Sequence, residues 1–94
     1  MSVRIRCINK PDRFSPHDAI INYGWIEDGT EKSDVTDRQT MVNWVKRGGI
    51  AYVKDSQGNI AYCRVNKSTA GTEFLQTYAD GKFTDNLLSL IECK

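Results

Sequence analysis

The stretch that decides the fold is Thr36-Asp37-Arg38-Gln39-Thr40-Met41-Val42-Asn43-Trp44-Val45-Lys46-Arg47-Gly48, the one run with the periodicity of an amphipathic helix. At about 100° per residue, one side of such a helix is apolar and carries Met41, Val42, Trp44 and Val45. The other side is polar and carries Gln39, Thr40, Asn43, Lys46 and Arg47. We therefore expect one helix that packs its apolar side against a sheet.

Both ends of this predicted helix carry local signals. Thr36 is the expected N-cap, and Gln39 three residues later completes a capping box. Asp37 adds negative charge at the end of the helix where the dipole favours it. Gly48 is expected to adopt the left-handed conformation that ends the helix.

The remaining chain is typical of strands, because apolar and polar residues alternate along it. We expect a turn-rich connection over residues 28–33 and a polar connection over residues 55–59 that joins two strands in a hairpin. The apolar residues 87–91 should pack onto the domain, either as a short strand or as a helical turn. The expected strands cover residues 3–9, 19–27, 50–54, 60–67 and 73–78.

These elements predict an α+β fold with a small, mainly antiparallel sheet of about five strands and one helix packed on one face, in the order β-β-α-β-β-β. The 94 residues fit a single domain over residues 1–94. A net charge of +1 gives no global bias toward nucleic acid. The chain contains neither a signal peptide pattern nor a long apolar run, so we expect a cytoplasmic protein that does not engage a membrane.

The three cysteines, Cys7, Cys63 and Cys93, are an odd number without a close pair. This spacing disfavours a disulfide framework and a structural zinc site, so we expect reduced thiols and no metal or cofactor. A cysteine paired with His17 would be the arrangement of a nucleophilic enzyme, but free cysteines are usually small buried hydrophobes. Catalysis is therefore the least supported function.

Strand alternation predicts a basic, tyrosine-bearing sheet face. Val3, Ile5 and Cys7 should face the core and Arg4, Arg6 and Ile8 the other side. If Ala51, Val53, Ala61, Cys63 and Val65 face the helix, the opposite face carries Tyr52, Lys54, Tyr62 and Arg64. Tyrosines interleaved with cations can stack bases and contact phosphates, although exposed strands favour the same residues for ordinary reasons of propensity. The candidate binding residues are Arg4, Arg6, Tyr52, Lys54, Tyr62 and Arg64.

Other candidate sites have weaker signals. His17 beside Asp18 could form a general base, but adjacent side chains point in different directions and a structural role at the start of a strand is favoured. Asp80, Asp85 and Asn86 supply oxygens near a turn without the spacing of a calcium loop. Gly24 within a strand indicates a bulge or a close backbone approach. Trp25 and Trp44 are expected in the core or at its edge.

Several segments resemble one family of small bacterial proteins. They are Arg6-Cys7-Ile8-Asn9-Lys10, then His17 and Gly24, and above all the closing run from Phe74-Leu75-Gln76-Thr77-Tyr78 through Phe83-Thr84-Asp85-Asn86-Leu87-Leu88-Ser89-Leu90. These residues resemble domain of unknown function family 3892, and the similarity extends over nearly the whole chain. The family usually has a proline after the last leucine, where this chain has Ile91. The resemblance implies a single small domain and no particular activity, cofactor or catalytic residue.

We therefore expect a non-enzymatic binding or interaction module that acts through the sheet face or an edge strand, with a protein partner or a second copy of itself as a homodimer. The alternative is a domain that binds a small anionic ligand, a nucleotide or a single-stranded nucleic acid through the Tyr/Arg face.

Overall fold

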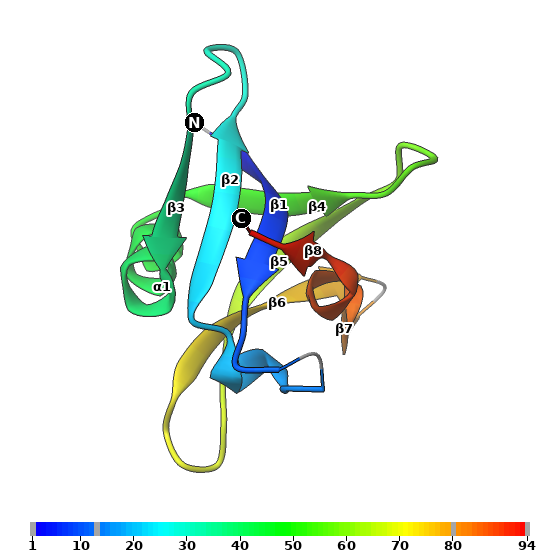
Figure 1. Cartoon of the computed structure of the whole chain (residues 1–94). Helices are drawn as coiled ribbons and strands as arrows, with labels where there is room; N and C mark the ends of the chain where they lie inside the picture. The colour runs from blue at the N-terminus through cyan, green and yellow to red at the C-terminus, as the bar shows by residue number, and fades with distance from the viewer. Residues whose placement is uncertain (1, 13, 80, 94) are drawn as a thin grey trace.

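The protein folds as one curled sheet with an α-helix packed beside it, in a computed structural model that describes residues 2–12, 14–79 and 81–93 (Figure 1). The elements are, in chain order, β1 (Ser2–Asn9), the 3₁₀-helix η1 (His17–Ala19), β2 (Asn22–Glu27), β3 (Ser33–Asp37), α1 (Arg38–Lys46), β4 (Ile50–Lys54), β5 (Ile60–Lys67), β6 (Glu73–Ala79), β7 (Lys82–Thr84), the 3₁₀-helix η2 (Asn86–Ser89) and β8 (Ile91–Glu92). The α+β class is thus confirmed.

The sheet has the strand order β3-β2-β1-β4-β5-β6-β7, and β8 pairs with β1 outside this path. The pairing is mainly antiparallel, as predicted, but β1 pairs in parallel with β4 near its start and with β8 near its end. β1 therefore has two different neighbours on the same side. Figure 1 shows β4, β5 and β6 bending away from β1 and β2, so that the sheet curls around its core.

The prediction of about five strands is wrong, because the described residues form eight. β3 was not predicted: Ser33 was expected in the connection before the helix and Thr36 and Asp37 at the helix start, and its sequence Ser-Asp-Val-Thr-Asp is mostly polar. It is an edge strand whose order comes from backbone pairing with β2. β7 and β8 are too short to have a recognisable pattern. The segment expected as strand or helical turn over residues 87–91 contains both, η2 followed by β8.

The helix lies where it was predicted, but its start is different. Thr36 belongs to β3, and Asp37 is the N-cap, whose carboxylate accepts hydrogen bonds from the Thr40 backbone N–H (3.0 Å) and hydroxyl (2.7 Å). These hydrogen bonds from Thr40 lower the pKa of Asp37. Gln39 donates to Asn43 instead of closing a capping box. At the other end Gly48 has φ +106°, which confirms the predicted left-handed stop.

The core lies between the inner face of the sheet and the apolar side of α1. Met41 and Val42 are buried, while Trp44 and Val45 pack at the edge of the same cluster. The inner face of β4 and β5 carries Ala51, Val53, Ala61 and Cys63, all buried as predicted from strand alternation. Val65 is only partly buried against the cluster. The other buried members of the cluster are Val3, Ile5, Ile8, Ile20, Tyr23, Leu75 and Leu87.

A β-bulge in β1 changes which of its side chains face the core. The register with β2 shifts between Ile5 and Cys7, so that Arg6 is the extra residue. Beyond the bulge Ile8 is fully buried, whereas Cys7 lies opposite Gly24 on the other face of the sheet. The predicted orientations of Cys7 and Ile8 are therefore wrong, because alternation holds only while the ladder is regular.

Cys7 and Cys93 form a disulfide, so the expectation that all thiols are reduced is wrong for these two. The bond was not foreseeable from spacing because 86 positions separate the cysteines, and only the pairing of β8 with β1 brings them to a Cα–Cα distance of 5.0 Å. Gly24 lies directly beneath the two sulfurs, and a Cβ at this position would approach the Cys93 Sγ to 2.7 Å. The predicted bulge or close approach at Gly24 is thereby confirmed.

The second predicted strand is shorter than expected. β2 begins at Asn22, and residues 17–19 form the 3₁₀-helix η1, so Ala19 is not part of a strand. The Ile21 backbone N–H donates to the carbonyl of Asn9 at 2.7 Å, which links this connection to the end of β1. Ile20 is completely buried and anchors the same connection in the core.

Candidate functional site

Four aromatic side chains form a row across the outer face of the sheet, the face directed away from the core. Tyr52 of β4 lies opposite Tyr62 of β5, which lies opposite Tyr78 of β6. Tyr78 in turn lies opposite Phe83 of β7. Directly paired residues of neighbouring strands project from the same face, so the row is continuous over four strands. We call these residues, Tyr52, Tyr62, Tyr78 and Phe83, the aromatic row.

The rings contact one another in pairs. The centroids of Tyr52 and Tyr62 are 6.1 Å apart with the planes tilted by 59°. Tyr78 and Phe83 are 5.1 Å apart and meet edge to face at 78°. Tyr62 is 56% exposed and Phe83 38%, which leaves aromatic surface open to solvent in the middle and at one end of the row.

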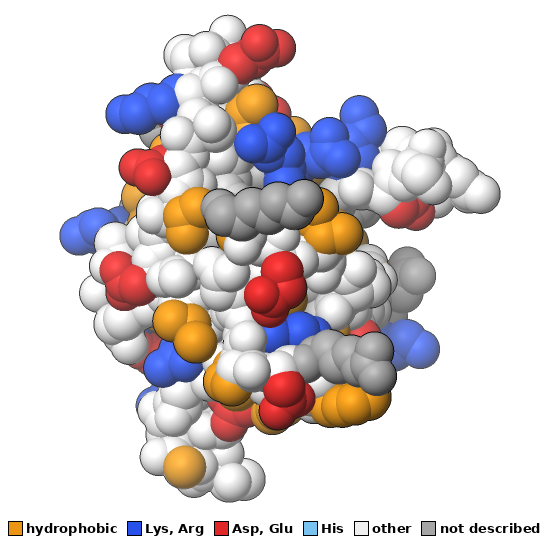
Figure 2. All heavy atoms as spheres, viewed as in Figure 1, with side chains coloured by type: hydrophobic (Ala, Val, Ile, Leu, Met, Phe, Trp, Pro, Cys, Tyr) orange, Lys and Arg blue, Asp and Glu red, His pale blue; other side chains and the backbone are white. Residues whose placement is uncertain are grey.

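Cations accompany the aromatic row. The guanidinium carbon of Arg64 lies 4.1 Å from the ring centroid of Tyr78, a cation–π contact. Arg4 pairs with Tyr52 across the β1–β4 ladder, and Lys54 is exposed at the end of β4. Figure 2 shows Lys and Arg side chains gathered near β4. The structure thus brings together five of the predicted residues, Arg4, Tyr52, Lys54, Tyr62 and Arg64.

A carboxylate fixes one end of the row. Asp28 accepts a hydrogen bond from the Ser2 hydroxyl at 2.6 Å and from the Tyr52 hydroxyl at 2.7 Å. The bonds from Ser2 and Tyr52 lower the pKa of Asp28, so it is ionised at neutral pH. The bond to Asp28 raises the pKa of Tyr52. The Tyr52 ring is therefore held in place, whereas Tyr62 is open to a ligand.

Arg6 does not join the row. It lines a shallow hollow of about 260 Å³ beside the Cys7–Cys93 disulfide, together with Gly24 and Val35. The strand next to β1 changes at this point: β1 pairs with β4 only as far as Arg4 and then with β8 from Cys7, so no residue of β4 lies opposite Arg6. The C-terminal segment leaves the aromatic row open, since Leu87 of η2 is buried in the core.

Sequence reasoning missed Tyr78 and Phe83. Tyr78 was the last residue of a predicted strand and Phe83 lay in the segment after the following turn, and neither was included in the candidate site. Their place in the row depends on the register of β5, β6 and β7, which connects Tyr62 to residues that are 16 and 21 positions further along the chain. The alternation of residues within a single strand does not determine how that strand is aligned with its neighbours.

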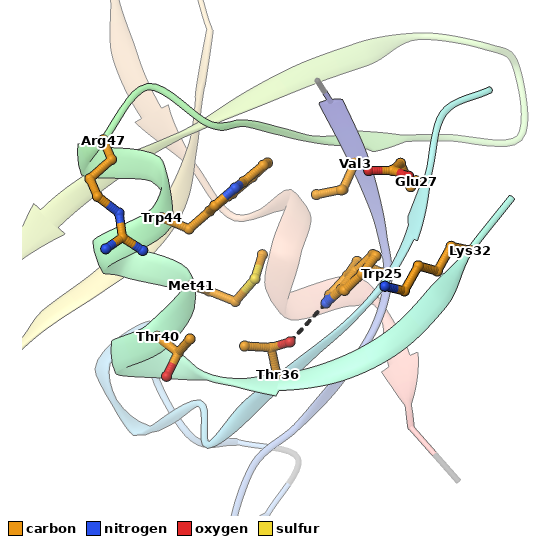
Figure 3. Close-up of a pocket in the computed structure, with 9 residues that line it drawn as sticks. All are labelled: Val3, Trp25, Glu27, Lys32, Thr36, Thr40, Met41, Trp44 and Arg47. Carbon is orange, nitrogen blue, oxygen red and sulfur yellow. Dashed lines mark hydrogen bonds between the residues drawn. The ribbon is translucent and has the colours of Figure 1, made fainter. Parts of the chain in front are cut away.

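A second candidate site is a pocket of about 340 Å³ between α1 and the first strands (Figure 3). Trp25 of β2 and Trp44 of α1 form two of its walls, and Met41 and Val3 lie between them. Trp25 and Trp44 are only partly buried, as expected for the core edge, but their exposed surface lines this pocket. Nothing in the sequence pattern indicated that strand and helix leave this gap.

His17 and Asp18 take part in separate structural contacts. His17 is 7% exposed and stacks on Phe74 with the ring centroids 6.2 Å apart. Burial lowers its pKa, although the nearby Asp85 acts in the opposite direction. Asp18 contributes its carbonyl oxygen, which accepts from the Arg38 guanidinium at 2.8 Å. These contacts support the structural role that was favoured from the sequence.

The thiols offer no nucleophile for His17. Cys7 and Cys93 are oxidised, and burial raises the pKa of Cys63 to about 12. A thiol with this pKa is protonated at neutral pH and unreactive.

Within residues 2–12, 14–79 and 81–93, no three His, Cys, Asp or Glu side chains come together to hold a metal ion; Asp80 of the oxygen-bearing turn lies outside these ranges. None of the described helices is long and apolar enough to cross a membrane.

Comparison with known proteins identifies the family of the chain but not its activity. No curated protein and no solved structure matches the sequence. One family model does, and it aligns with residues 4–91, from the third residue of β1 to the first residue of β8, which include both candidate sites except Val3. The resemblance noted in the sequence is thus confirmed. The chain belongs to the family described as protein of unknown function (DUF3892).

Proposed function

We propose that this protein is a binding module that binds single-stranded nucleic acid on the aromatic row. The observation that carries the proposal is the continuity of the row over four strands, from Tyr52 to Phe83, with Arg4, Lys54 and Arg64 beside it. Exposed aromatic rings stack bases of any sequence, and neighbouring cations contact the phosphates.

The chemistry of the face favours an extended anionic polymer with flat groups. Neighbouring strands are about 4.8 Å apart, so successive rings of the row can be met by successive bases of a strand that crosses the sheet. The guanidinium of Arg64 already lies over the ring of Tyr78, and a guanidinium on this face can stack on a base and bind a phosphate. At the Tyr52 end of the row lies Asp28, whose carboxylate accepts hydrogen bonds from the Ser2 and Tyr52 hydroxyls.

Pairing through an edge strand, with the protein as a homodimer, is less well supported than binding through the face. Along the edge strand β3, the carboxylate of Asp34 accepts the Val35 backbone N–H at 2.8 Å, which withdraws this donor from an added strand. Asp34 and Asp37 would also repel the same edge of a second copy. The opposite edge, β7, offers only three residues, Lys82–Thr84.

Fluorescence anisotropy with labelled single-stranded oligonucleotides tests the proposal. If Arg4, Lys54 and Arg64 neutralise three phosphates, the affinity should fall about 20-fold between about 50 and 200 mM salt. Arg64→Ala should weaken binding and reduce the slope of log Kd against log salt by about 0.7. Tyr62→Ala should weaken binding at least about fivefold through the loss of one stacked base.

Arg47→Ala is the matched control, because Arg47 lies at the end of α1 and away from the outer face. It should leave the affinity unchanged. Light scattering should show the same mass for wild type and Tyr62→Ala. Absence of binding at low salt, or a dimer that Tyr62→Ala dissociates, would overturn the proposal, the latter in favour of self-association through the same face. The cytoplasmic location expected from the sequence is not part of the proposal, since disulfides are typical of oxidising compartments.

A further inference from the structure

The pocket between α1 and strands β1 to β3 is separate from the aromatic row and is built from different residues (Figure 3). Its volume of about 340 Å³ is at the lower end of the range for small-molecule sites. Val3, which lines it, points to the inner face of β1, whereas the neighbouring Arg4 belongs to the outer face. A ligand bound here would not touch the proposed nucleic-acid surface.

The geometry points to a binding site for a small amphipathic anion that has a flat apolar body. The indoles of Trp25 and Trp44 stand on opposite sides of the pocket with the Met41 side chain between them (Figure 3). Two large aromatic walls and a polarisable thioether provide favourable contacts for a planar ring system.

The charges around the opening select an anion. Lys32 and Arg47 lie at opposite ends of the pocket, and neither has an ion-pair partner in the part of the chain that the structure describes (Figure 3). Glu27 is the acid that lines the pocket, and its carboxylate already accepts a hydrogen bond from Thr30 at 2.6 Å. Two cations against one acid leave a net charge of +1, which an anionic group on the ligand would complement.

The walls are fixed before any ligand binds. The indole N–H of Trp25 donates to the Thr36 hydroxyl at 2.9 Å, which orients the ring and satisfies its polar atom. The ring of Trp44 lies against Gly49, where a side chain would collide with it. A preformed pocket loses little conformational entropy on binding.

Nuclear magnetic resonance offers a direct test, because the chain contains two tryptophans and both line this pocket. Naphthalene-2-sulfonate, a planar ring with one negative charge, should shift both indole N–H signals in a saturable titration. The cation 2-naphthylmethylammonium, which has the same ring, should bind at least about fivefold more weakly because it meets Lys32 and Arg47.

Variants of the two cations at the opening of the pocket distinguish an anion-binding site from a general apolar surface. Arg47→Ala and Lys32→Ala should each weaken sulfonate binding about two- to fivefold. Arg64→Ala on the outer face is the matched control and should leave it unchanged. Equal affinity for sulfonate and ammonium, indole signals that do not shift, or shifts confined to outer-face residues would overturn the inference. None of these outcomes bears on nucleic-acid binding, because the two variants exchange roles there: Arg64→Ala is the test and Arg47→Ala is the control.

Discussion

Tyr23 is the largest completely buried side chain, and its hydroxyl is placed to satisfy the backbone of another strand. Its oxygen accepts a hydrogen bond from the Leu75 N–H at 3.1 Å, across the core from β2 to β6. Burial raises the pKa of Tyr23 to about 12, because the phenolate would lose its hydration. One phenol therefore couples the two halves of the curled sheet and makes the fold sensitive to base.

We predict that base destabilises the protein through Tyr23. In the unfolded chain a tyrosine ionises near pH 10, so the stabilisation is complete below pH 10 and disappears as the pH rises toward about 12. The free energy of unfolding should fall by about 1.4 kcal/mol by pH 11 from this group. At pH 7 the free energy of unfolding of Tyr23→Phe should be about 1–3 kcal/mol lower than that of wild type, because the Leu75 N–H is left unpaired. Between pH 9 and 11 it should fall by less than that of wild type.

Urea unfolding at pH 7, 9 and 11 measures both effects. Cys63 contributes in the same direction, since its raised pKa makes its stabilisation disappear as the pH rises from about 9 to about 12. Cys63 is unchanged in Tyr23→Phe, so the difference between the two proteins isolates the phenol. An identical pH dependence in wild type and Tyr23→Phe would contradict the assignment.

A second prediction at the scale of one residue concerns Gly24. A methyl group at this position meets the sulfurs of Cys7 and Cys93, so Gly24→Ala should destabilise the protein by about 1–3 kcal/mol. In a protein that carries Cys7→Ala and Cys93→Ala the sulfurs are gone, and the same substitution should be nearly neutral. A double-mutant cycle, measured by thermal or urea unfolding, gives the coupling free energy between Gly24→Ala and the loss of the disulfide. Equal losses in both backgrounds would mean that strand propensity, not the disulfide, requires glycine.

At the scale of elements, the parts that could be predicted are those specified by local pattern. The alternation along β4 and β5 assigned Ala51 and Tyr62 to opposite faces, and the structure agrees. The same reasoning failed in β1, because the bulge at Arg6 reverses the alternation for Cys7 and Ile8. A bulge results from pairing with the partner strand, so a single strand sequence does not reveal it.

The start of the helix shows the same limit. Thr36 and Asp37 are both good N-caps, and the capping-box pattern favoured Thr36. The backbone of Thr36 is engaged in β3 opposite Tyr23, so helical geometry begins one residue later and Asp37 becomes the cap. The polar sequence of β3 concealed a strand whose pairing decided this boundary.

Two neighbouring glycines end the helix for different reasons, and their alanine variants should differ accordingly. Gly48 has φ +106° and open space around it, so Gly48→Ala should lose about 1–2 kcal/mol through backbone strain and leave the Trp44 indole signal in place. Gly49→Ala should shift that signal, because the new methyl group collides with the Trp44 ring. Urea unfolding and the indole N–H resonances measure the two effects; an unmoved Trp44 signal in Gly49→Ala would contradict the packing.

At the scale of the whole molecule, tertiary register assembles both candidate sites. The sequence suggested Tyr52, Tyr62 and Arg64 on one face, and these residues do lie together. Tyr78 and Phe83 join them only through the meander of β5, β6 and β7. The Trp25–Trp44 pocket is a space that remains between α1 and the first strands of the sheet. Neither register nor packing gaps can be derived from the periodicity of one segment.

The Cys7–Cys93 disulfide joins two residues that are 86 positions apart. We predict that reducing it lowers the free energy of unfolding of the whole protein. Closing a loop of 86 residues stabilises the folded state by up to about 4–5 kcal/mol in the chain-entropy model. Guanidinium unfolding with and without reductant should show a lower midpoint when the bond is reduced. Alkylation of the denatured protein should label one thiol, Cys63, without reductant and three with it.

Cys93→Ser separates the covalent link from the contacts that β8 makes without it. The Cys93 backbone still donates to the Ile8 carbonyl and accepts from the Asn9 side chain, both at 3.1 Å. These hydrogen bonds are individually worth about 1 kcal/mol, and β8 adds a parallel pairing of only two residues with β1, which together are too little to order this segment. We therefore expect that Cys93→Ser exposes the Ile8 and Cys93 amides to fast hydrogen exchange, while Tyr23 and Leu75 amides remain protected. Uniform protection in Cys93→Ser would mean that strand pairing holds β8 and that the disulfide only follows from it.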